Sequence, residues 1–175
     1  MLIATIETQL GNMVAGSVEE GICLCEFSDR NTLEAELNDL KKYLQQEICE
    51  GENHHIKNLR LQLNEYFDGT RKLFDIPIIA PGTEFQKKVW NELLNIPYGA
   101  TITYQQQSNA LKNPLSIRAV ASANGKNRIS IIIPCHRVIG TDGSLTGYGG
   151  GLHRKKWLLN HEKKHAGKPF NNTLF

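Results

Sequence analysis

This sequence lacks the features that place a chain in a membrane or on the secretory route. No apolar run approaches the roughly 20 residues that a membrane-spanning helix requires, and residues 1–7 show neither the basic start nor the long apolar core of a secretory leader. Cysteine is scarce, at 4 residues with no CxxC pair among them. We therefore expect no membrane contact, free thiols, and a reducing compartment: the cytoplasm or, in a eukaryote, the nucleus.

Metal-binding patterns are missing as well. Cys23 and Cys25 stand in an apolar run typical of a buried strand. Five residues of the first half could be imagined as zinc ligands, but their spacing matches no standard site: Cys23, Cys25, Cys49, His54 and His55. We favour core cysteines over a metal site, and we expect no metal and no cofactor.

Acidic residues are rare in the second half of the chain. Residues 1–80 hold 7 Lys+Arg and 14 Asp+Glu, whereas residues 81–175 hold 13 and 4, so the net charge of +2 conceals an acidic half and a basic half. Simple solvation of surface charge gives no reason for this segregation. A basic half favours contact with a polyanion, and nucleic acid is the polyanion that we favour.

The first half is patterned as strands followed by helices. Residues 2–8 and 13–27 carry alternating and apolar runs separated by turn residues, which predicts strands. Asn31 with Glu34 resembles a helix start, a second helix is expected near 56–67, and residues 72–81 are typical of an extended linker. We predict a structural N-terminal domain over residues 1–80.

The second half is patterned as helices. Thr83 and Gln86 form a capping-box pair that predicts a helix start. Short helices over 103–111 and 116–124, joined by a turn at 112–114, predict a helix-turn-helix. A last helix is expected over about 151–165, followed by a loosely ordered tail at 168–175. The predicted fold is α+β or α/β, with the N-terminal domain packed on a helical domain (81–175) that carries a short active-site strand.

Cys135 stands directly after the most apolar stretch of the second half. The β-branched run at 129–133 predicts a buried strand that ends at Pro134, because proline cannot donate to a sheet ladder. Cys135 then follows where the chain leaves the sheet, and the adjacent His136 and Arg137 would favour a thiolate. On this adjacency alone a buried core cysteine is the better interpretation.

The second helix of the helix-turn-helix is poor in long polar side chains. Arg118 is its only charged residue before Lys126, and the residues around it are small. A helix that reads base edges normally displays several long polar side chains. The pattern argues against a sequence-specific regulator. The small side chains permit the helix to approach a sugar-phosphate backbone closely.

Several motifs together resemble one family. They are Thr103-Tyr104-Gln105-Gln106-Gln107, Asn113-Pro114, Ser116 to Ala121, Asn124 to Val138, Gly147-Tyr148-Gly149-Gly150-Gly151 and Trp157 to Glu162. From about residue 82 to 162 the chain resembles the O6-alkylguanine-DNA alkyltransferases, also called methylated-DNA–protein-cysteine methyltransferases. The stretch from Asn124 to Val138 is the most specific part of this resemblance.

The resemblance implies a role for each matching residue. Cys135 would accept the alkyl group, His136 would act as base through a water molecule, and Glu162 would orient His136. Asn127 would brace the turn before the cysteine. The resemblance also implies that Tyr104 helps to rotate the base and donates a proton to it, and that Arg118 fills the space left by the flipped nucleotide. It implies further contacts with DNA from Ser116, Ala119 and Ala121. It implies contacts with the substrate from Val138, Tyr148 and Gly149. Ser130, where some members carry proline, predicts a roomier pocket, and Gly149 stands where some have serine.

The implied reaction is the irreversible transfer of an alkyl group from O6-alkylguanine, and also from O4-alkylthymine, to Cys135. The base would be flipped out of duplex DNA bound through the minor groove. A thioether offers no acyl carbon for hydrolysis, so each molecule would act once, as a monomer. Three alternatives stay open: an alkyltransferase-like protein that binds lesions without catalysis, a helix-turn-helix regulator and a cysteine hydrolase. The presence of Cys135 argues against the first.

Overall fold

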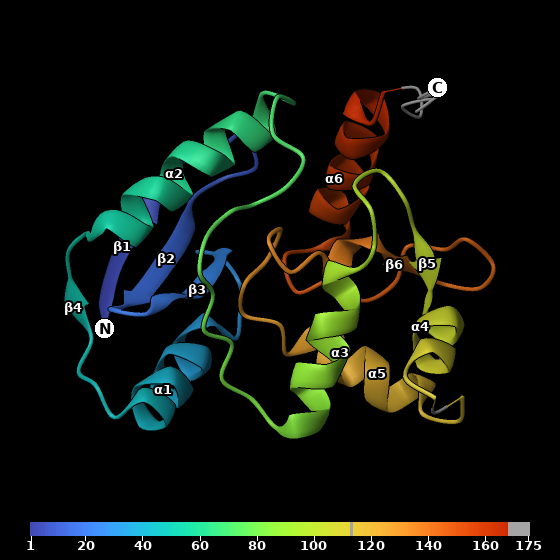
Figure 1. The fold of residues 1–175 in the computed structure, drawn as a ribbon, viewed down its shortest axis with the longest axis horizontal. Helices are drawn as coiled ribbons and strands as arrows, with labels where there is room; N and C mark the ends of the chain where they lie inside the picture. The colour runs from blue at the N-terminus through green and yellow to red at the C-terminus, as the bar shows by residue number, and fades with distance from the viewer. Residues whose placement is uncertain (113, 168–175) are drawn as a thin grey trace, which may run out of the picture.

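The structure of this protein is a computed structural model that describes residues 1–112 and 114–167. Its N-terminal half contains four strands and two helices: β1 (Leu2–Ile6), β2 (Met13–Val18), β3 (Gly21–Phe27), α1 (Leu33–Leu44), β4 (Cys49–Glu50) and α2 (His54–Phe67). The C-terminal half contains the remaining elements: α3 (Glu84–Leu94), β5 (Ile102–Thr103), α4 (Tyr104–Ala110), α5 (Ile117–Gly125), the 3₁₀ turn η1 (Cys135–Arg137), β6 (Val138–Ile139) and α6 (Leu152–His165). The two halves lie side by side (Figure 1).

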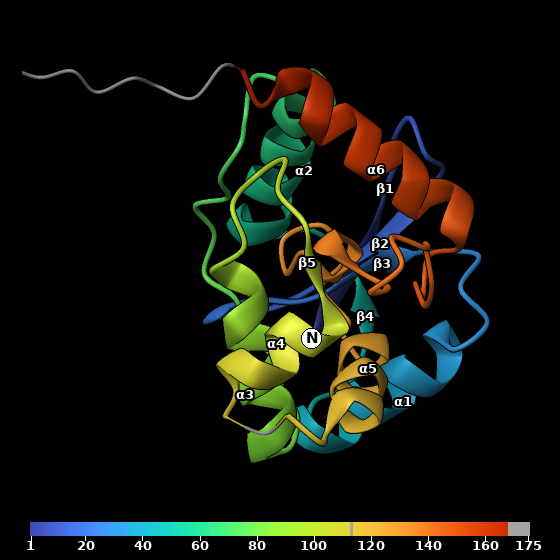
Figure 2. The same ribbon diagram turned by 90° about the vertical axis from the view of Figure 1, so that its right-hand side faces the viewer.

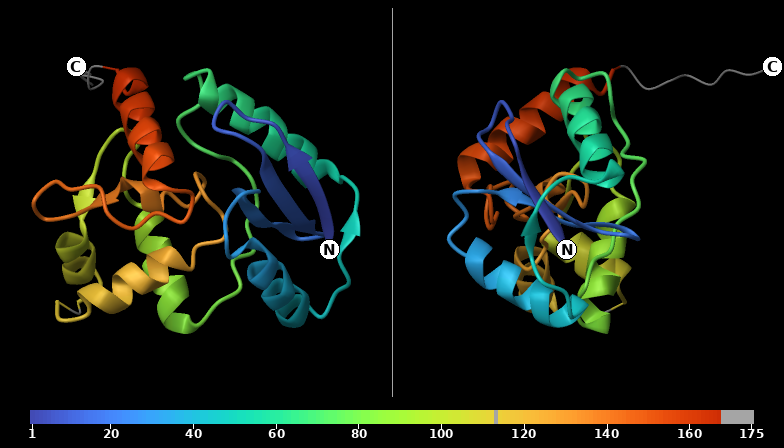
Figure 3. Two further views of the ribbon diagram at one scale, coloured as in Figure 1. Left: turned by 180° about the vertical axis from the view of Figure 1, so that it is seen from behind. Right: turned by 90° about the vertical axis from the view of Figure 1, so that its left-hand side faces the viewer.

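A four-stranded sheet in the order β3-β2-β1-β4 organises the N-terminal half. β1, β2 and β3 are antiparallel neighbours, whereas β4 runs parallel to β1. α2 and α1 lie above and below the strands in the right-hand view of Figure 3. α1 begins after Thr32 rather than at the predicted Asn31, and the Thr32 side chain makes no cap hydrogen bond. These elements place β3 next to the C-terminal half.

The predicted helix-turn-helix is present as α4 and α5, which lie at the opposite end of the C-terminal half from α6 (Figure 2). Capping boxes start α3 at Thr83 and α4 at Thr103. The buried Trp90 indole of α3 donates to the carbonyl of Ala123 in α5, at 2.8 Å. This bond and the packing of α3 against α5 fix the second helix of the motif.

The predicted strand over 129–133 is wrong. Only Ile129 makes a strand-like bridge, to Cys25 of β3, and the following residues form turns. Ile131 has φ 73°, and the Ile133 N–H donates to the Ile129 carbonyl at 3.0 Å, so the chain coils back on itself. The short strand of this region is β6, which follows the cysteine and pairs with β5.

One apolar core runs through both halves. It joins residues of the sheet and of α2, such as Phe27 and Leu59, to residues of α3 and of the cysteine segment, such as Val89 and Ile133. The extended segment after α2 also pairs with β3, since the Ile22 N–H donates to the Pro77 carbonyl at 2.9 Å. The division into domains at about residue 80 stays a prediction.

The cysteine predictions are confirmed in part. Cys23 and Cys25 are fully buried, but Cys49 is exposed on the short edge strand β4, so its placement in the core was wrong. No helix in the described part of the chain is long and apolar enough to span a membrane. The predicted turn residue Asn113 and the predicted loose tail at 168–175 lie outside the described residues.

Candidate active site

Cys135 is held at the start of a tight 3₁₀ turn. Its N–H donates to the Ile133 carbonyl at 2.8 Å, and β6 begins directly after the turn at Val138. The residue is 7% exposed. The thiol is thus fixed between a coiled apolar segment and a short strand, with little freedom to move.

Asn127 braces the segment that leads to the cysteine. Its side-chain N–H₂ donates to the Ile133 carbonyl at 2.8 Å and to Cys135 Sγ at 3.3 Å, while its Oδ1 accepts from the Ile129 N–H at 2.9 Å. These bonds satisfy backbone groups that a strand ladder would otherwise satisfy, which explains why a β-branched run forms a turn here.

The Cys135 thiol is neutral at rest. Burial raises its pKa to about 11, although the Asn127 hydrogen bond acts in the opposite direction. A thiolate is the nucleophilic form of cysteine, so the proton must leave during the reaction. The site therefore needs a base.

His136 is placed to be that base, although no hydrogen bond joins its ring to Cys135. The ring is fully buried, and burial lowers its pKa, so the imidazole is neutral. Nε2 lies 2.8 Å from Glu162 Oε1. An ionised carboxylate only accepts hydrogen bonds, so Nε2 carries the proton and Nδ1 is an acceptor. Nδ1 is buried and has no hydrogen-bond partner within the described structure.

Glu162 is the centre of a buried network. Besides His136, its carboxylate accepts from the Tyr66 hydroxyl at 2.8 Å, from the Gly99 N–H at 3.0 Å and from the Arg137 guanidinium at 2.9 Å on each oxygen. Burial alone would raise the Glu162 pKa, but the bonds from His136 and Arg137 hold it well below its usual range. Glu162 is therefore ionised and fixed.

Tyr104 and Lys155 support the other side of the site. The Tyr104 hydroxyl donates to the carbonyls of Thr146 and Gly147 at 3.2 and 3.3 Å, and burial raises its pKa, so it keeps its proton. Lys155 is fully buried and donates to the carbonyls of Val138 and Thr146, both at 2.6 Å. Burial lowers the pKa of Lys155 to about 8.

The predicted substrate contacts lie around the same turn. The Tyr148 ring meets the His136 ring edge-on, with centroids 6.3 Å apart. Val138 is fully buried, and its carbonyl is occupied by Lys155. Gly149 is exposed on the glycine-rich loop that precedes α6. Their contacts with a substrate stay predictions.

The predicted DNA contacts lie apart from the thiol, on α5 and at its start. Arg118 and Ala119 are exposed, Ala121 is half-buried, and Ser116 is the residue before the helix. The interior of the motif is polar, because the buried Gln107 and Asn124 side chains bond each other at 2.7 and 3.3 Å. α5 thus presents one arginine among small residues on its outer side.

Sequence reasoning missed several residues of this site. Three of them carried no local pattern, because their partners are far away in the chain: Tyr66, Gly99 and Lys155. Tyr66 and Glu162, for example, are 96 positions apart. Arg137 was expected to favour a thiolate, but its hydrogen bonds go to Glu162 and to the Ile96 carbonyl instead. The acidic residue of the last helix and the bulky residues before it were the only signal for the network. No group of three or more His, Cys, Asp or Glu able to hold a metal ion occurs in the described residues.

Together these features define a helix-turn-helix protein in which one buried cysteine, Cys135, adjoins a histidine–carboxylate pair. Residues 84–164 match the family model described as 6-O-methylguanine DNA methyltransferase, DNA binding domain. A methylated-DNA–protein-cysteine methyltransferase of Methanosarcina acetivorans is 40% identical over 162 residues, which cover 93% of this chain and 98% of that protein. The chain belongs to the methylated-DNA–protein-cysteine methyltransferase family.

Two comparisons with Mycobacterium tuberculosis agree. Its methylated-DNA–protein-cysteine methyltransferase is 52% identical over 114 residues, which cover 65% of this chain and 68% of that protein. The crystal structure of M. tuberculosis OGT in complex with DNA has a TM-score of 0.82 and 34% sequence identity and covers 94% of each chain. The similarity therefore extends to the N-terminal half, where the motifs quoted above are absent.

Proposed function

We propose that this protein repairs DNA by direct reversal, transferring the alkyl group of O6-alkylguanine, and of O4-alkylthymine, to Cys135. The observation that carries the proposal is the buried Cys135 thiol next to a neutral histidine whose Nδ1 has no hydrogen-bond partner among the described residues and can accept a proton. Membership of the methyltransferase family supports the substrate class. The protein acts where DNA and reduced thiols occur together, in the cytoplasm or a nucleus, and as a monomer.

The chemical step is a displacement at saturated carbon. The bond between Cys135 Sγ and the alkyl carbon forms while the bond from that carbon to O6 breaks. A water molecule relays the thiol proton to His136 Nδ1, and the Glu162 carboxylate stabilises the imidazolium that results. Tyr104 donates a proton to the leaving guanine. His136 then gives up its proton and Tyr104 regains one, by exchange through solvent, so that in balance a thiol and an alkylguanine become a thioether and guanine.

α5 delivers the damaged base to this site. Its small residues Ala119 and Ala121 permit close approach to the backbone in the minor groove, with Ser116 at the start of the helix. Arg118 enters the duplex and fills the space of the flipped nucleotide. The extruded base is contacted by Tyr148, Gly149 and Val138. Asn127 holds the turn that carries the cysteine in a fixed position after α5.

The product fixes the stoichiometry. A thioether has no acyl carbon that water attacks, and the other cysteines, Cys23, Cys25 and Cys49, lie in the N-terminal half, in β3 and β4. Each molecule therefore acts once. An alkyltransferase-like protein that only binds lesions is the alternative, but the presence of Cys135 disfavours it.

The test is to weigh the intact protein after one exposure to duplex DNA that contains O6-methylguanine. We expect the mass of one methyl group, located at Cys135 by peptide mapping, and a one-to-one ratio of protein to repaired base. Cys135→Ala should gain no mass and still bind the duplex, while Cys49→Ala, the matched control, should react as the unaltered protein does. Methylation of Cys135→Ala contradicts the assignment.

A further inference from the structure

Glu26 is a buried acid outside the machinery described above. It lies on β3 of the N-terminal half and is 0% exposed. A carboxylate is almost never fully buried without partners. Its oxygens accept from the Phe27 N–H at 2.9 Å and from the Ser130 hydroxyl at 2.8 Å, and they form an ion pair with Arg30. A strand of the N-terminal half is thus bonded to the segment that leads to the cysteine.

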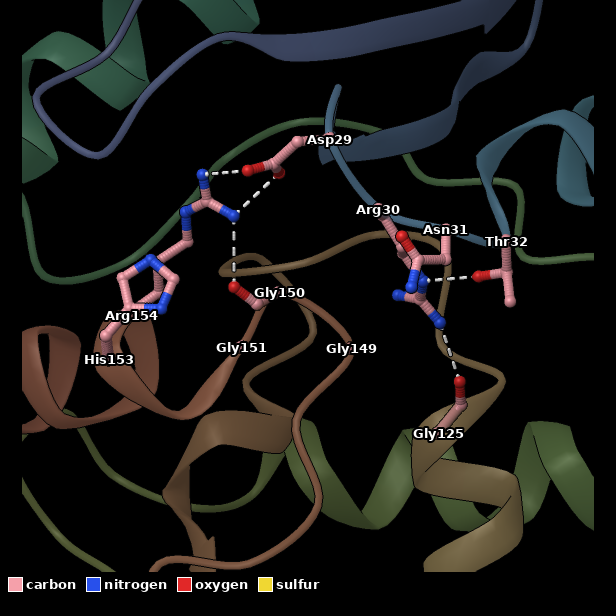
Figure 4. Close-up of a pocket in the computed structure, with 10 residues that line it drawn as sticks. All are labelled: Asp29, Arg30, Asn31, Thr32, Gly125, Gly149, Gly150, Gly151, His153 and Arg154. Carbon is pink, nitrogen blue, oxygen red and sulfur yellow. Dashed lines mark hydrogen bonds and ion pairs between the residues drawn. The ribbon is translucent and has the colours of Figure 1, made fainter.

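Arg30 extends this connection to the DNA-binding motif. Its guanidinium donates to the Gly125 carbonyl, at the end of α5, at 2.7 Å and to the Asn127 carbonyl at 3.2 Å. It also pairs with Glu36 at 3.0 Å. The fixed fork of an arginine side chain suits such multiple bonds. Figure 4 shows Arg30 reaching from the β3–α1 loop to Gly125.

The glycine-rich loop also rests on Arg30. A Cβ added at Gly149 would overlap the Arg30 guanidinium. Arg30 therefore lies directly against the loop backbone, and a larger residue at position 149 would require the guanidinium to move. One side chain of the N-terminal half thereby touches α5, the Asn127 turn and the loop that carries Tyr148.

We infer that Glu26 and Arg30 are positioning residues for alkyl transfer, setting Asn127, Ser130 and Gly149 around Cys135. This inference rests on the proposed function. A thiol attacks only when it lies in line with the bond that breaks, and a misplacement of about 1 Å can slow such a reaction about 10²-fold. The N-terminal half is then part of the reaction site and more than a structural support.

The test compares Glu26→Gln and Ser130→Ala with Glu52→Gln, which removes the acid of the partly exposed Arg60–Glu52 pair in the same half. Single-turnover rates are measured with O6-methylguanine duplex and with free O6-benzylguanine, per folded molecule as judged by circular dichroism. We expect both site variants to be slower with both substrates, Glu26→Gln by about tenfold or more, and Glu52→Gln to be unchanged.

The pH profile of thiol alkylation by iodoacetamide separates positioning from mere folding. Burial is the main cause of the raised Cys135 pKa, and the charge of Glu26 adds to it, whereas Asn127, Arg30 and Lys155 lower it. Glu26→Gln should therefore make the thiol more acidic and yet slow the transfer. Wild-type rates or an unchanged thiol pKa in the folded variant overturn the inference; if Glu26→Gln does not fold, Ser130→Ala decides by its rates. Absence of transfer in the unaltered protein instead overturns the proposed function.

Discussion

At the scale of single residues, the candidate nucleophile and its candidate base are two separate neutral groups. The Cys135 thiol is neutral, with a pKa of about 11, and the neighbouring His136 is neutral because burial lowers its pKa. Neither group is charged in the resting state, so neither carries the cost of burying a charge. Glu162 and Arg137 are charged and are paired in a bidentate geometry, and the buried Lys155 ammonium donates to two backbone carbonyls. In the proposed mechanism, the reaction begins when the proton moves from sulfur to the imidazole.

This arrangement predicts that His136 and Glu162 act as one unit. His136→Ala should slow methyl transfer by roughly 10²-fold, the usual contribution of a general base, and Glu162→Gln should slow it less. The double variant should be little worse than His136→Ala, because groups that act together are not additive. Single-turnover rates, corrected for the folded fraction, provide the measurement.

The pH dependence offers a second readout of this unit. The unaltered protein has a neutral base at pH 7, so its rate should change little from pH 7 to 9 apart from the titration of Lys155, whose pKa is about 8. His136→Ala depends on ionisation of the thiol alone, and its rate should rise with pH toward the thiol pKa of about 11. A flat profile in folded His136→Ala would leave the histidine a structural role only.

At the scale of elements, the proposed function makes α5 a helix that delivers the damaged base rather than one that reads sequence. Its outer side offers Arg118 among small residues, while its inner side is fixed by the Gln107–Asn124 pair and by Trp90. Arg118→Ala should slow repair in duplex DNA about tenfold or more, equivalent to ~1.4 kcal/mol, because extrusion of the base loses its support. Alkylation by free O6-benzylguanine should stay unchanged, since no flipping is needed.

The control for Arg118 is Lys163→Ala, which removes an exposed cation from α6 instead. Its duplex repair should differ little from that of the unaltered protein. An equal loss with both substrates in Arg118→Ala would assign the arginine to the fold or to the chemistry.

Helices were more predictable than the cysteine segment, and the reason is physical. Capping boxes such as Thr83 with Gln86 are local signals, and both partners lie within one turn. The run at 129–133 has strong β-propensity, yet the Asn127 side chain and the bridge to β3 hold it in turns. The residues brought to Glu162 from 63 and 96 positions away could not be found without the fold. A family resemblance identified Cys135, His136 and Glu162, because the family's known site already records which residues come together in the fold.

At the scale of the whole molecule, the acidic and basic halves are joined by buried polar groups as well as by apolar packing. Glu26–Arg30 meets the cysteine segment, and Tyr66 meets Glu162. The Arg154–Asp29 pair joins α6 to the β3–α1 loop at 2.7 and 2.9 Å. Because these bonds cross between the halves, we expect the two to unfold together rather than separately.

The buried groups also predict how stability depends on pH. The pKa of His136 is lowered from its ordinary 6.5, so below that pH the unfolded chain binds a proton that the folded chain refuses. The pKa of Glu162 is also lowered, from 4.5, so the stability it contributes above pH 4.5 is lost as the pH falls further. The free energy of unfolding should therefore begin to fall near pH 6.5 and fall more steeply below 4.5, by up to about 1.4 kcal/mol per pH unit for each proton.

Urea denaturation between pH 7 and pH 4 measures this dependence. His136→Gln should flatten the slope between pH 6.5 and 5, leaving the share of His161, whose pKa is also lowered by burial. The control His153→Gln alters an exposed histidine at the start of α6 and should keep the full slope. If His136→Gln and the unaltered protein lose stability in parallel over this range, His136 is not held neutral in the folded state. In that case folding would not keep the proton off His136, and the imidazole would become neutral only during the reaction.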